Sequence, residues 1–444
     1  MNSLKNKICK LIDENYDYTE EVADYIYENP ELGFKEFKTN DYVKTKLDDL
    51  GISYESFDDV TGVKVTFDSG KSGASVAILA ELDALSCSSH LDSDRYTGAV
   101  HACGHNVMVA DILTIIKVFS EIKIMDSLSG KISFLIVPAE EYGDMDYRLN
   151  LIRDKIISYP TGKSEMINRG FFDDIDTCIM MHLMPGDKYL GIETGGNGFV
   201  AKKIEYKGLA SHAASKPENG INALYAANLG LMAVNSIRET FKESACVRVH
   251  PVVSKGGDAM NVIPDDVQVE TLVRANNIDE IESVNKKVNM AFAGGAISMG
   301  AEVSIQDTPG MLPLNVCDEL IDLAKETALD FVDKDEINVY EPSKGSSDLG
   351  DVSSLMPAIE ICIECVEGGL HTSDFRLYDK KKAYNFASKM LACMAIKLLV
   401  NDGLLVDQLL ENYKPYFSCK REYLDFMDKC FEKSTYKAEM YIKK

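Results

Sequence analysis

The chain has 444 residues, and 71 acidic against 47 basic side chains give it a formal net charge of −24. Its length predicts two domains rather than one small core. The negative charge argues against a nucleic-acid partner, because such binding depends on Lys and Arg neutralising phosphates. Eleven cysteines, an odd number scattered along the chain, predict free thiols rather than a disulfide framework.

Nothing in the sequence predicts export or membrane insertion. Residues 1–10 are followed by Asp13 and Glu14 before any apolar run develops, which is unlike a signal peptide. Later apolar stretches are broken by charge or glycine before they reach the roughly 20 residues that a membrane span needs. We therefore expect a cytoplasmic protein without a membrane partner.

The first part of the chain predicts an α/β fold. A helical pattern ends at Asn29-Pro30, a pair that stops a helix. Short apolar strands then alternate with helices, which is typical of a sheet covered on both faces. The expected helices cover residues 4–28 and 106–122, and the expected strands cover residues 62–67, 74–82, 132–137 and 178–181.

The middle of the chain has a different pattern, in the order β-α-β-β-α-β. This is a split βαβ unit, which can fold as its own small domain. After it, the chain returns to long helices and an apolar strand near residues 359–363. The expected strands of the unit cover residues 200–207, 246–253, 267–273 and 301–305, and its helices cover residues 221–240 and 281–292.

These elements predict an α/β protein of two domains. Residues 1–196 and 311–444 would form one domain around a mixed sheet. Residues 197–310 would form an inserted ferredoxin-like (βαββαβ) domain.

Most of the chemically unusual side chains lie in short polar segments that follow apolar strands, where α/β proteins build their sites. Cys103 and His105 flank a glycine, so the chain can bend and aim both at one ion. Thiolate, imidazole and carboxylate are the ligands that Zn²⁺ and its neighbours prefer. The alternative is a buried cysteine in a turn beside a histidine bonded to backbone. Cys362 and Cys365 have similar spacing but lie in an apolar run, and we interpret them as core.

Glu140 and Glu141 directly follow an apolar strand. Two adjacent carboxylates in this place also suit a solvated helix start, where negative charge favours the helix dipole. In the functional interpretation, one carboxylate binds a metal ion and its neighbour takes a proton from water.

Together these segments resemble the M20 metallopeptidase family, specifically the amidohydrolases of its subfamily D. The resemblance extends from residues 29–34 to residues 371–375 and rests on His-Ala-Cys-Gly-His at 101–105, Pro-Ala-Glu-Glu at 138–141 and two later histidines. Asn106 and the segments at residues 162–176 and 345–353 resemble the group of aminobenzoyl-glutamate hydrolase B-subunits and Xaa-Arg dipeptidases more closely.

The resemblance implies a di-metal catalytic domain in which Cys103 bridges two divalent ions. His105 and His182 would complete one site, and Glu141 and His371 the other. Thiolate and imidazole ligands favour Zn²⁺, with Mn²⁺, Co²⁺ or Ni²⁺ as alternatives.

Other residues receive catalytic or substrate-binding roles from the same resemblance. Glu140 would be the general base, and Asp83 would orient a metal ligand. The inserted domain would be a lid and dimerisation domain, so we expect a homodimer. In that domain His212 would reach an active site, while Asn261 and Arg274 would bind the substrate carboxylate. For Arg274 the alternative is an exposed charge at a strand end.

The resulting hypothesis is a metal-dependent amidohydrolase that uses metal-activated water, with Glu140 as general base. It would cleave the amide bond of an N-acyl amino acid, an aminobenzoyl-glutamate-like conjugate or a dipeptide with a free carboxylate. One rival is a thiol hydrolase with Cys103 as nucleophile and His105 as base. The other is an inactive binding or scaffold protein.

The sequence departs from the family pattern in three places. Residues 142–160 form a charged insertion, expected to be helical and to lie beside the site. Tyr27 stands where many members of the subfamily have His. The tail beyond about Asp402 is longer than in short aminoacylases.

Overall fold

The computed structural model describes residues 2–437 and divides into two compact units. The first unit comprises Met1–Gly195, Asn315–Ser343 and Asp348–Lys420. The second comprises Gly196–Leu314, Lys344–Ser347 and Arg421–Lys444.

The first unit is built on a mixed nine-stranded sheet in the order β1-β2-β6-β3-β7-β17-β8-β16, with β18 paired to β17. At its centre β3 runs parallel to both β6 and β7, and β7 runs parallel to β17. The strands are β1 (Glu55–Ser56), β2 (Val63–Asp68), β3 (Ser75–Glu81), β6 (Lys131–Val137), β7 (Thr177–Pro185), β8 (Leu190–Ile192), β16 (Ile337–Val339), β17 (Ala358–Glu367) and β18 (Arg376–Leu377). Two short strands, β4 (Leu85–Ser86) and β5 (Ala99–Val100), pair separately.

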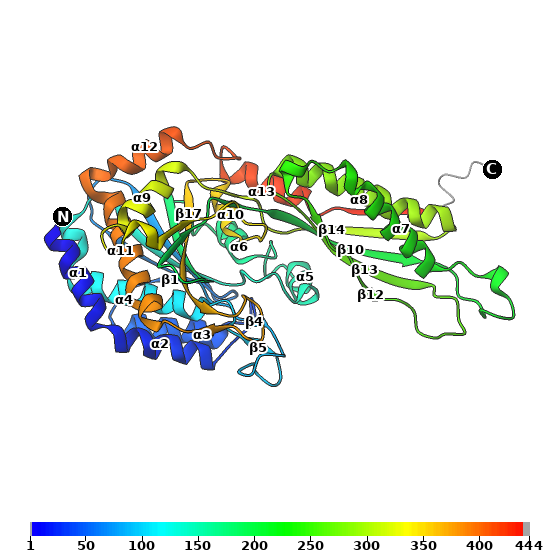
Figure 1. Cartoon of the computed structure of the whole chain (residues 1–444), viewed down its shortest axis with the longest axis horizontal. Helices are drawn as coiled ribbons and strands as arrows, with labels where there is room; N and C mark the ends of the chain where they lie inside the picture. Colours follow the sequence, from blue (N-terminus) through cyan, green and yellow to red (C-terminus); the bar gives the residue numbers. More distant parts are fainter. Residues whose placement is uncertain (1, 438–444) are drawn as a thin grey trace. The chain divides into compact units, whose positions relative to one another are not determined.

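Helices cover this sheet because its central strands are apolar on both faces; every residue of β3 is buried. Figure 1 shows α9 and α11 on one side of β17 and α6 and α10 on the other. Helix α4 packs against β3 and α2, which explains why nearly its whole circumference is apolar. The helices are α1 (Asn2–Glu14), α2 (Tyr16–Glu28), α3 (Phe37–Asp49), α4 (His105–Glu121), α5 (Met145–Arg153), α6 (Gly162–Arg169), α9 (Asp318–Ala328), α10 (Leu349–Ser353), α11 (Ala387–Leu399) and α12 (Leu404–Asn412).

The second unit is an antiparallel sheet in the order β11-β13-β10-β14-β19, with β12 also paired to β13. Residues of β13 alternate between buried and more exposed, because helices α7 and α8 cover one face of the sheet. The elements are β10 (Gly198–Lys207), α7 (Ala223–Ile237), β11 (Arg248–Val249), β12 (Val252–Lys255), β13 (Asp266–Ala275), α8 (Ile278–Met299), β14 (Glu302–Pro309), α13 (Lys420–Lys429) and β19 (Lys433–Lys437).

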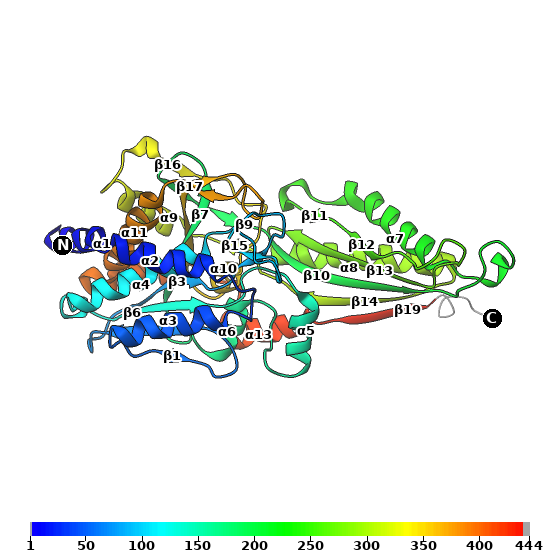
Figure 2. The same ribbon diagram turned by 90° about the horizontal axis from the view of Figure 1, so that it is seen from below.

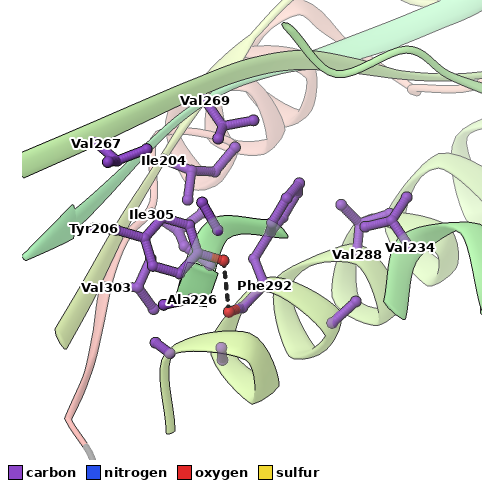
Figure 3. Packing of buried hydrophobic residues seen from close by; sticks show 14 of the residues in the cluster. Ile204, Tyr206, Ala226, Val234, Val267, Val269, Val288, Phe292, Val303 and Ile305 are labelled. Carbon is purple, nitrogen blue, oxygen red and sulfur yellow. Dashed lines mark hydrogen bonds between the residues drawn. The ribbon is translucent and has the colours of Figure 1, made fainter. Parts of the chain in front are cut away.

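The core of this unit lies between the sheet and the two helices (Figure 3). Tyr206 of β10 and Phe292 of α8 are both fully buried there. The Tyr206 hydroxyl donates a hydrogen bond to the Phe292 carbonyl at 2.8 Å, so the one polar atom of this ring is satisfied inside an apolar cluster.

The predicted α/β class, the mixed sheet and the β-α-β-β-α-β order are confirmed. The predicted helix at residues 4–28 is two helices, separated at Asn15, whose side chain bonds the Leu11 carbonyl. The predicted strand at 246–253 is divided into β11 and β12 around Pro251, which has no N–H to donate.

One assignment differs in the C-terminal tail. The sequence placed residues 311–444 in the first domain, but β19 pairs with β14 in the sheet of the second unit (Figure 2). The reason is physical: β19 is a polar strand at a sheet edge, and only its long-range pairing reveals where it belongs. None of the helices within residues 2–437 combines the length and apolar character that a membrane crossing requires.

Candidate metal centre

The side chains of the candidate site come from the carboxyl ends of three neighbouring parallel strands and from the segments around Cys103 and His371. β3 ends at Glu81, β6 is followed by Glu140 and Glu141, and β7 carries His182. Because β6, β3 and β7 are adjacent and parallel, these ends meet at one edge of the sheet. Gly104, with a left-handed φ of 88°, then turns the chain sharply into α4.

Cys103 lies at the centre of a cluster of possible metal ligands. Its Sγ is 3.2 Å from Nε2 of His182 and 3.3 Å from Nε2 of His371. Nε2 of His371 is in turn 3.0 Å from a carboxylate oxygen of Glu141. Two groups with metal-ligand spacing therefore share the cysteine: Cys103 with His105 and His182, and Cys103 with Glu141 and His371.

His371 is held in place by its backbone. Its φ is 62°, a left-handed conformation that is uncommon for a residue with a side chain. Its N–H donates to the Ala102 carbonyl at 3.0 Å, which ties the late loop to the segment that carries Cys103. Left-handed backbone at non-glycine residues is characteristic of functional sites.

His105 is oriented by the segment that follows β3. Its Nδ1 is 2.8 Å from the Asp83 carbonyl oxygen. Because a carbonyl only accepts, Nδ1 carries a proton at this contact, and Nε2 is the ring nitrogen that faces the other side chains of the cluster. Nε2 lies 3.0 Å from Oε2 of Glu81, yet neither atom has a hydrogen-bond partner. Glu81, His105 and Glu140 form a third group with metal-ligand spacing.

Several buried polar atoms of this cluster lack hydrogen-bond partners among the described residues. An unpaired buried donor or acceptor costs about 1–3 kcal/mol, so such atoms rarely gather without a reason. Here they belong to carboxylate and imidazole side chains around a cysteine. Thiol, imidazole and carboxylate groups are the donor set that fits divalent transition-metal ions. The atoms are Glu81 Oε2, Asp83 Oδ1, His105 Nε2, Glu141 Oε1 and His182 Nδ1.

Burial and crowding shift the ionisation of the cluster. Burial raises the pKa of Glu140 well above its usual range, and the carboxylate of Glu81 adds to the effect. Burial, reinforced by His105, lowers the pKa of His182 to about 4. Although burial opposes it, the Glu81 carboxylate raises the pKa of His105. Burial raises the pKa of the Cys103 thiol.

Two buried residues that sequence reasoning missed support the ends of β3 and β6. Nζ of Lys163, on α6, contacts carboxylate oxygens of both Glu81 and Asp348. Oε1 of Glu36 accepts a hydrogen bond from the Ala139 N–H at 2.8 Å. The segments containing Lys163 and Asp348 resembled one family group, but no local pattern assigns either residue a partner. Glu36 had no sequence signal.

Asp83 contacts both His105 and the backbone of Glu141. Besides the carbonyl contact to His105, its Oδ2 accepts a hydrogen bond from the Glu141 N–H at 2.9 Å. Oδ1 lies 3.3 Å from His105 Nδ1. One buried carboxylate therefore contacts two of the predicted ligands.

The three predicted residues of the inserted domain lie in the second unit. His212 is exposed, and its Nδ1 accepts from the N–H groups of Ala214 and Ser215 at 3.2 Å each. The Ala213 N–H bonds the carbonyl of Asn261 at 3.0 Å, which brings these two loops together. Arg274 donates to Ser346 at 2.7 Å. Their roles toward the cluster of the first unit stay predictions.

Two departures from the family pattern also have structural counterparts. Residues 142–160 contain α5, which begins at Met145. The Tyr27 hydroxyl donates to Asp92 at 2.9 Å, and both side chains line a cavity of about 730 Å³ in the first unit.

Comparison with known proteins identifies the family. A model of the peptidase family M20/M25/M40 matches residues 77–397, well over half of the chain. The chain is 27% identical over 361 residues to the Xaa-Arg dipeptidase of Mus musculus, covering 79% of this chain and 75% of that protein. It is also 27% identical to the hippurate hydrolase of Campylobacter jejuni, over 89% of this chain and 100% of that protein.

Solved structures share the fold. An aminobenzoyl-glutamate utilization protein from Klebsiella pneumoniae superimposes with a TM-score of 0.67 and 18% identity, covering 88% of this chain and 98% of that chain. A structure described as a dinuclear metal-binding peptidase of the M20 family, from Bacillus subtilis, gives a TM-score of 0.65 and 20% identity, covering 87% and 99%. The predicted resemblance is confirmed: the chain belongs to the peptidase family M20/M25/M40 and is a hydrolase that acts on amide or peptide bonds.

Proposed function

We propose that the protein is a two-metal amidohydrolase that cleaves a small substrate with a free carboxylate next to the scissile amide. The observation that carries this proposal is the pair of ligand groups that share Cys103. N-acyl amino acids, aminobenzoyl-glutamate-like conjugates and dipeptides are the substrate classes, in keeping with the names of the relatives.

Five side chains would hold the ions. Zn²⁺ suits the thiolate and imidazole donors best, and Mn²⁺, Co²⁺ and Ni²⁺ are the alternatives. Bound divalent ions would lower the pKa of water and polarise the substrate carbonyl. The ligands are Cys103, His105 and His182 for one ion, and Cys103, Glu141 and His371 for the other.

The remaining groups of the site move or direct protons. Glu140 acts as the general base: its carboxylate takes a proton from the attacking water and delivers it to the leaving amine. Asp83 positions His105 and the Glu141 backbone through the contacts described above.

Residues of the second unit bind the substrate in this proposal. The guanidinium of Arg274 is half-buried, donates to Ser346 and lies 4.9 Å from the centre of the Phe199 ring, which limits its motion. A planar, oriented guanidinium binds a carboxylate through paired hydrogen bonds. Asn261 would bind the same carboxylate, and His212 would stabilise the developing oxyanion.

A homodimer completes the proposal. Helix α7 exposes Tyr225, Leu229 and Met232, which follow one another at helical spacing, and edge strand β12 exposes Val252 and Val253. An apolar stripe beside an open strand edge is suited to association with a second copy. Sedimentation of the protein with and without Met232→Glu tests this: a dimer that dissociates in the variant supports the proposal, and a native monomer refutes it.

The rival thiol hydrolase is disfavoured by the surroundings of Cys103. A nucleophilic cysteine needs a lowered pKa, whereas burial raises the pKa of this thiol. Chelation separates the two mechanisms, because it would inactivate a metal enzyme and leave a thiol enzyme active.

The deciding experiment combines metal analysis with hydrolysis of a panel of N-acyl amino acids and dipeptides, before and after chelation. We expect about two ions per chain and activity that chelator abolishes and added metal restores. Glu140→Gln should keep its metals and lose roughly 10²–10⁴-fold in kcat. The exposed Glu326→Gln, which removes the same charge elsewhere on the first unit, should match the native enzyme. Near-native turnover in Glu140→Gln, or activity that survives chelation, would overturn the proposal.

A further inference from the structure

The insertion at residues 142–160 contains an arginine with an unusual environment. Arg148, on α5, is only 2% exposed, and it is the largest of the fully buried side chains. A guanidinium stays charged and is seldom buried without partners. Its burial at this place therefore requires an explanation from its contacts.

The partners of Arg148 are backbone carbonyls around the two adjacent glutamates. Nη1 donates to the Pro160 carbonyl at 2.6 Å and lies 3.4 Å from the Ala139 carbonyl. Nη2 donates to the carbonyl of Glu141. The peptide groups of Ala139 and Glu141 lie on either side of Glu140, so one planar side chain contacts the backbone before and after the general base.

This stretch of backbone is strained and depends on its surroundings. Ala139 has a φ of 52°, in the left-handed region that residues with a Cβ rarely adopt. The Gly162 N–H donates to the Ala139 carbonyl at 3.1 Å, and Glu36 accepts from the Ala139 N–H. Strained conformations persist only where neighbouring groups over-determine them.

Helix α5 is itself fixed to the protein, so Arg148 is a rigid support. The guanidinium lies 5.5 Å from the centre of the Phe34 ring. A Cβ at Gly33 would lie 2.5 Å from Nη2, so the guanidinium packs directly against the backbone of Gly33. The Tyr147 hydroxyl bonds the Phe34 carbonyl at 3.2 Å, and Asp144 pairs with Lys35 at 2.5 Å.

We propose that Arg148 is a positioning residue, which fixes the carbonyls of Ala139 and Glu141 and thereby aims the Glu140 carboxylate at its proton. This inference rests on the proposed function of Glu140. It also gives a role to the insertion at residues 142–160, because its helix α5 supports the loop that carries Glu140.

The first test compares Arg148→Met with Arg153→Met. Arg153 lies on the same helix, but its side chain is 70% exposed, and within residues 2–437 its bonding partner is the neighbouring Asp154. A misplacement of about 1 Å costs on the order of 10²-fold in rate, so Arg148→Met should lose roughly that factor in kcat. KM should stay within about threefold, because Arg148 does not touch substrate in this proposal. Arg153→Met should match the native enzyme.

Amide hydrogen exchange provides a readout that does not depend on activity. Amide exchange in peptides covering residues 138–142 should be faster in Arg148→Met and unchanged in Arg153→Met. Only the first substitution removes the hydrogen bonds that hold this loop. If Arg148→Met does not fold, Arg148→Lys replaces it: the ammonium keeps the charge but cannot reach both carbonyls in one plane. That variant should show an intermediate loss of kcat. Native kcat and native exchange in the folded variant would refute the inference.

A double variant connects Arg148 to Glu140. If Arg148 acts through Glu140, Arg148→Met should have little further effect in a Glu140→Gln background. Equal losses in both backgrounds would refute the positioning role and leave Glu140 as general base. If Glu140→Gln itself keeps the native rate, the proposed function fails, while the exchange experiment still reports whether Arg148 holds the loop.

Discussion

Replacing Lys163 by Met removes the lysine cation from a fully buried ionic group. Lys163 and Asp348 have side chains that are 0% exposed, and the side chain of Glu81 is 1% exposed. Nζ contacts both carboxylates, and the Lys163 N–H also donates to Asp348 at 2.9 Å. Methionine preserves most of the volume, so the substitution changes the charge rather than the packing.

The magnitude follows from the two carboxylates that remain. Breaking a buried ion pair by removing one partner costs about 3–5 kcal/mol. Because 1 kcal/mol shifts Tm by about 2–4 °C in domains of 150–250 residues, we expect Tm to fall by roughly 6–20 °C. Burial already raises the pKa of Asp348 to about 6, although Lys163 opposes this. Without Lys163 the pKa of Asp348 should rise further. The pKa of Glu81, which Lys163 holds below its usual range against the effect of burial, should rise above that range.

The pKa shifts determine whether Lys163→Met loses more stability at low or at high pH. A carboxyl group whose folded pKa lies above its unfolded value contributes stability that is lost as pH rises through the folded pKa. The deficit of Lys163→Met should therefore be smaller at pH 5 than at pH 8. The assay is thermal unfolding at both pH values with chelator present, which removes stabilisation by bound metal. The control is Lys420→Met, whose side chain is 32% exposed and pairs with a 57% exposed Asp173; it should cost less than about 1 kcal/mol. A Tm equal to that of the control, or a deficit independent of pH, would refute the reasoning.

Four further predictions concern single positions. Cys103→Ser should bind well below the native amount of metal in elemental analysis, because Cys103 belongs to both ligand groups; unchanged stoichiometry would contradict a bridging role. Gly162→Ala should disrupt the first unit, since its Cβ would lie 1.5 Å from the Pro138 carbonyl oxygen, and a native Tm would count against this close approach. Burial raises the pKa of Glu193 to about 7, so its ionisation destabilises the fold as pH rises through about 7. Glu193→Gln should thus gain about 1–3 kcal/mol at pH 8 and nothing near pH 4, measured by unfolding at both values. Arg274→Met should raise KM for carboxylate substrates at least tenfold, because hydrogen bonds to charged groups contribute more free energy than neutral ones. An unchanged KM would show that Arg274 does not bind the substrate.

Local patterns predicted the elements whose period or composition is strong. The apolar run of β3 corresponds to a fully buried strand, and the alternation of β13 corresponds to a strand with one buried face. The interpretation of Cys362 and Cys365 as core is confirmed, since both are fully buried in β17. The polar edge strand β19 could not be assigned to a sheet, because its stabilising partner, β14, is more than a hundred residues away in sequence.

The residues of the candidate site divide in the same way, into those that local patterns indicate and those whose partners are distant in sequence. Motif spacing singled out Cys103 and His105, and the structure brings both close to His182, which is far away in sequence. The charged residues that support the site lie in segments with no distinctive spacing. Lys163, Glu36 and Arg148 act through partners that tertiary folding brings to them, so only the structure reveals these contacts.

The carboxylates of the site explain why two buried cations, Lys163 and Arg148, lie beside it. Glu81, Asp83, Glu140 and Glu141 converge from the ends of two adjacent strands, and such carboxylates repel one another in a dry interior. Lys163, on α6, forms ion pairs with Glu81 and Asp348, and its charge also acts on Glu140 without an ion pair to it. Arg148 bonds to the backbone of Glu141 rather than to its carboxylate. The protein therefore uses its own cations to fix the framework and leaves the lone pairs of Glu141 and the histidines available, which is the arrangement that binding of divalent ions requires.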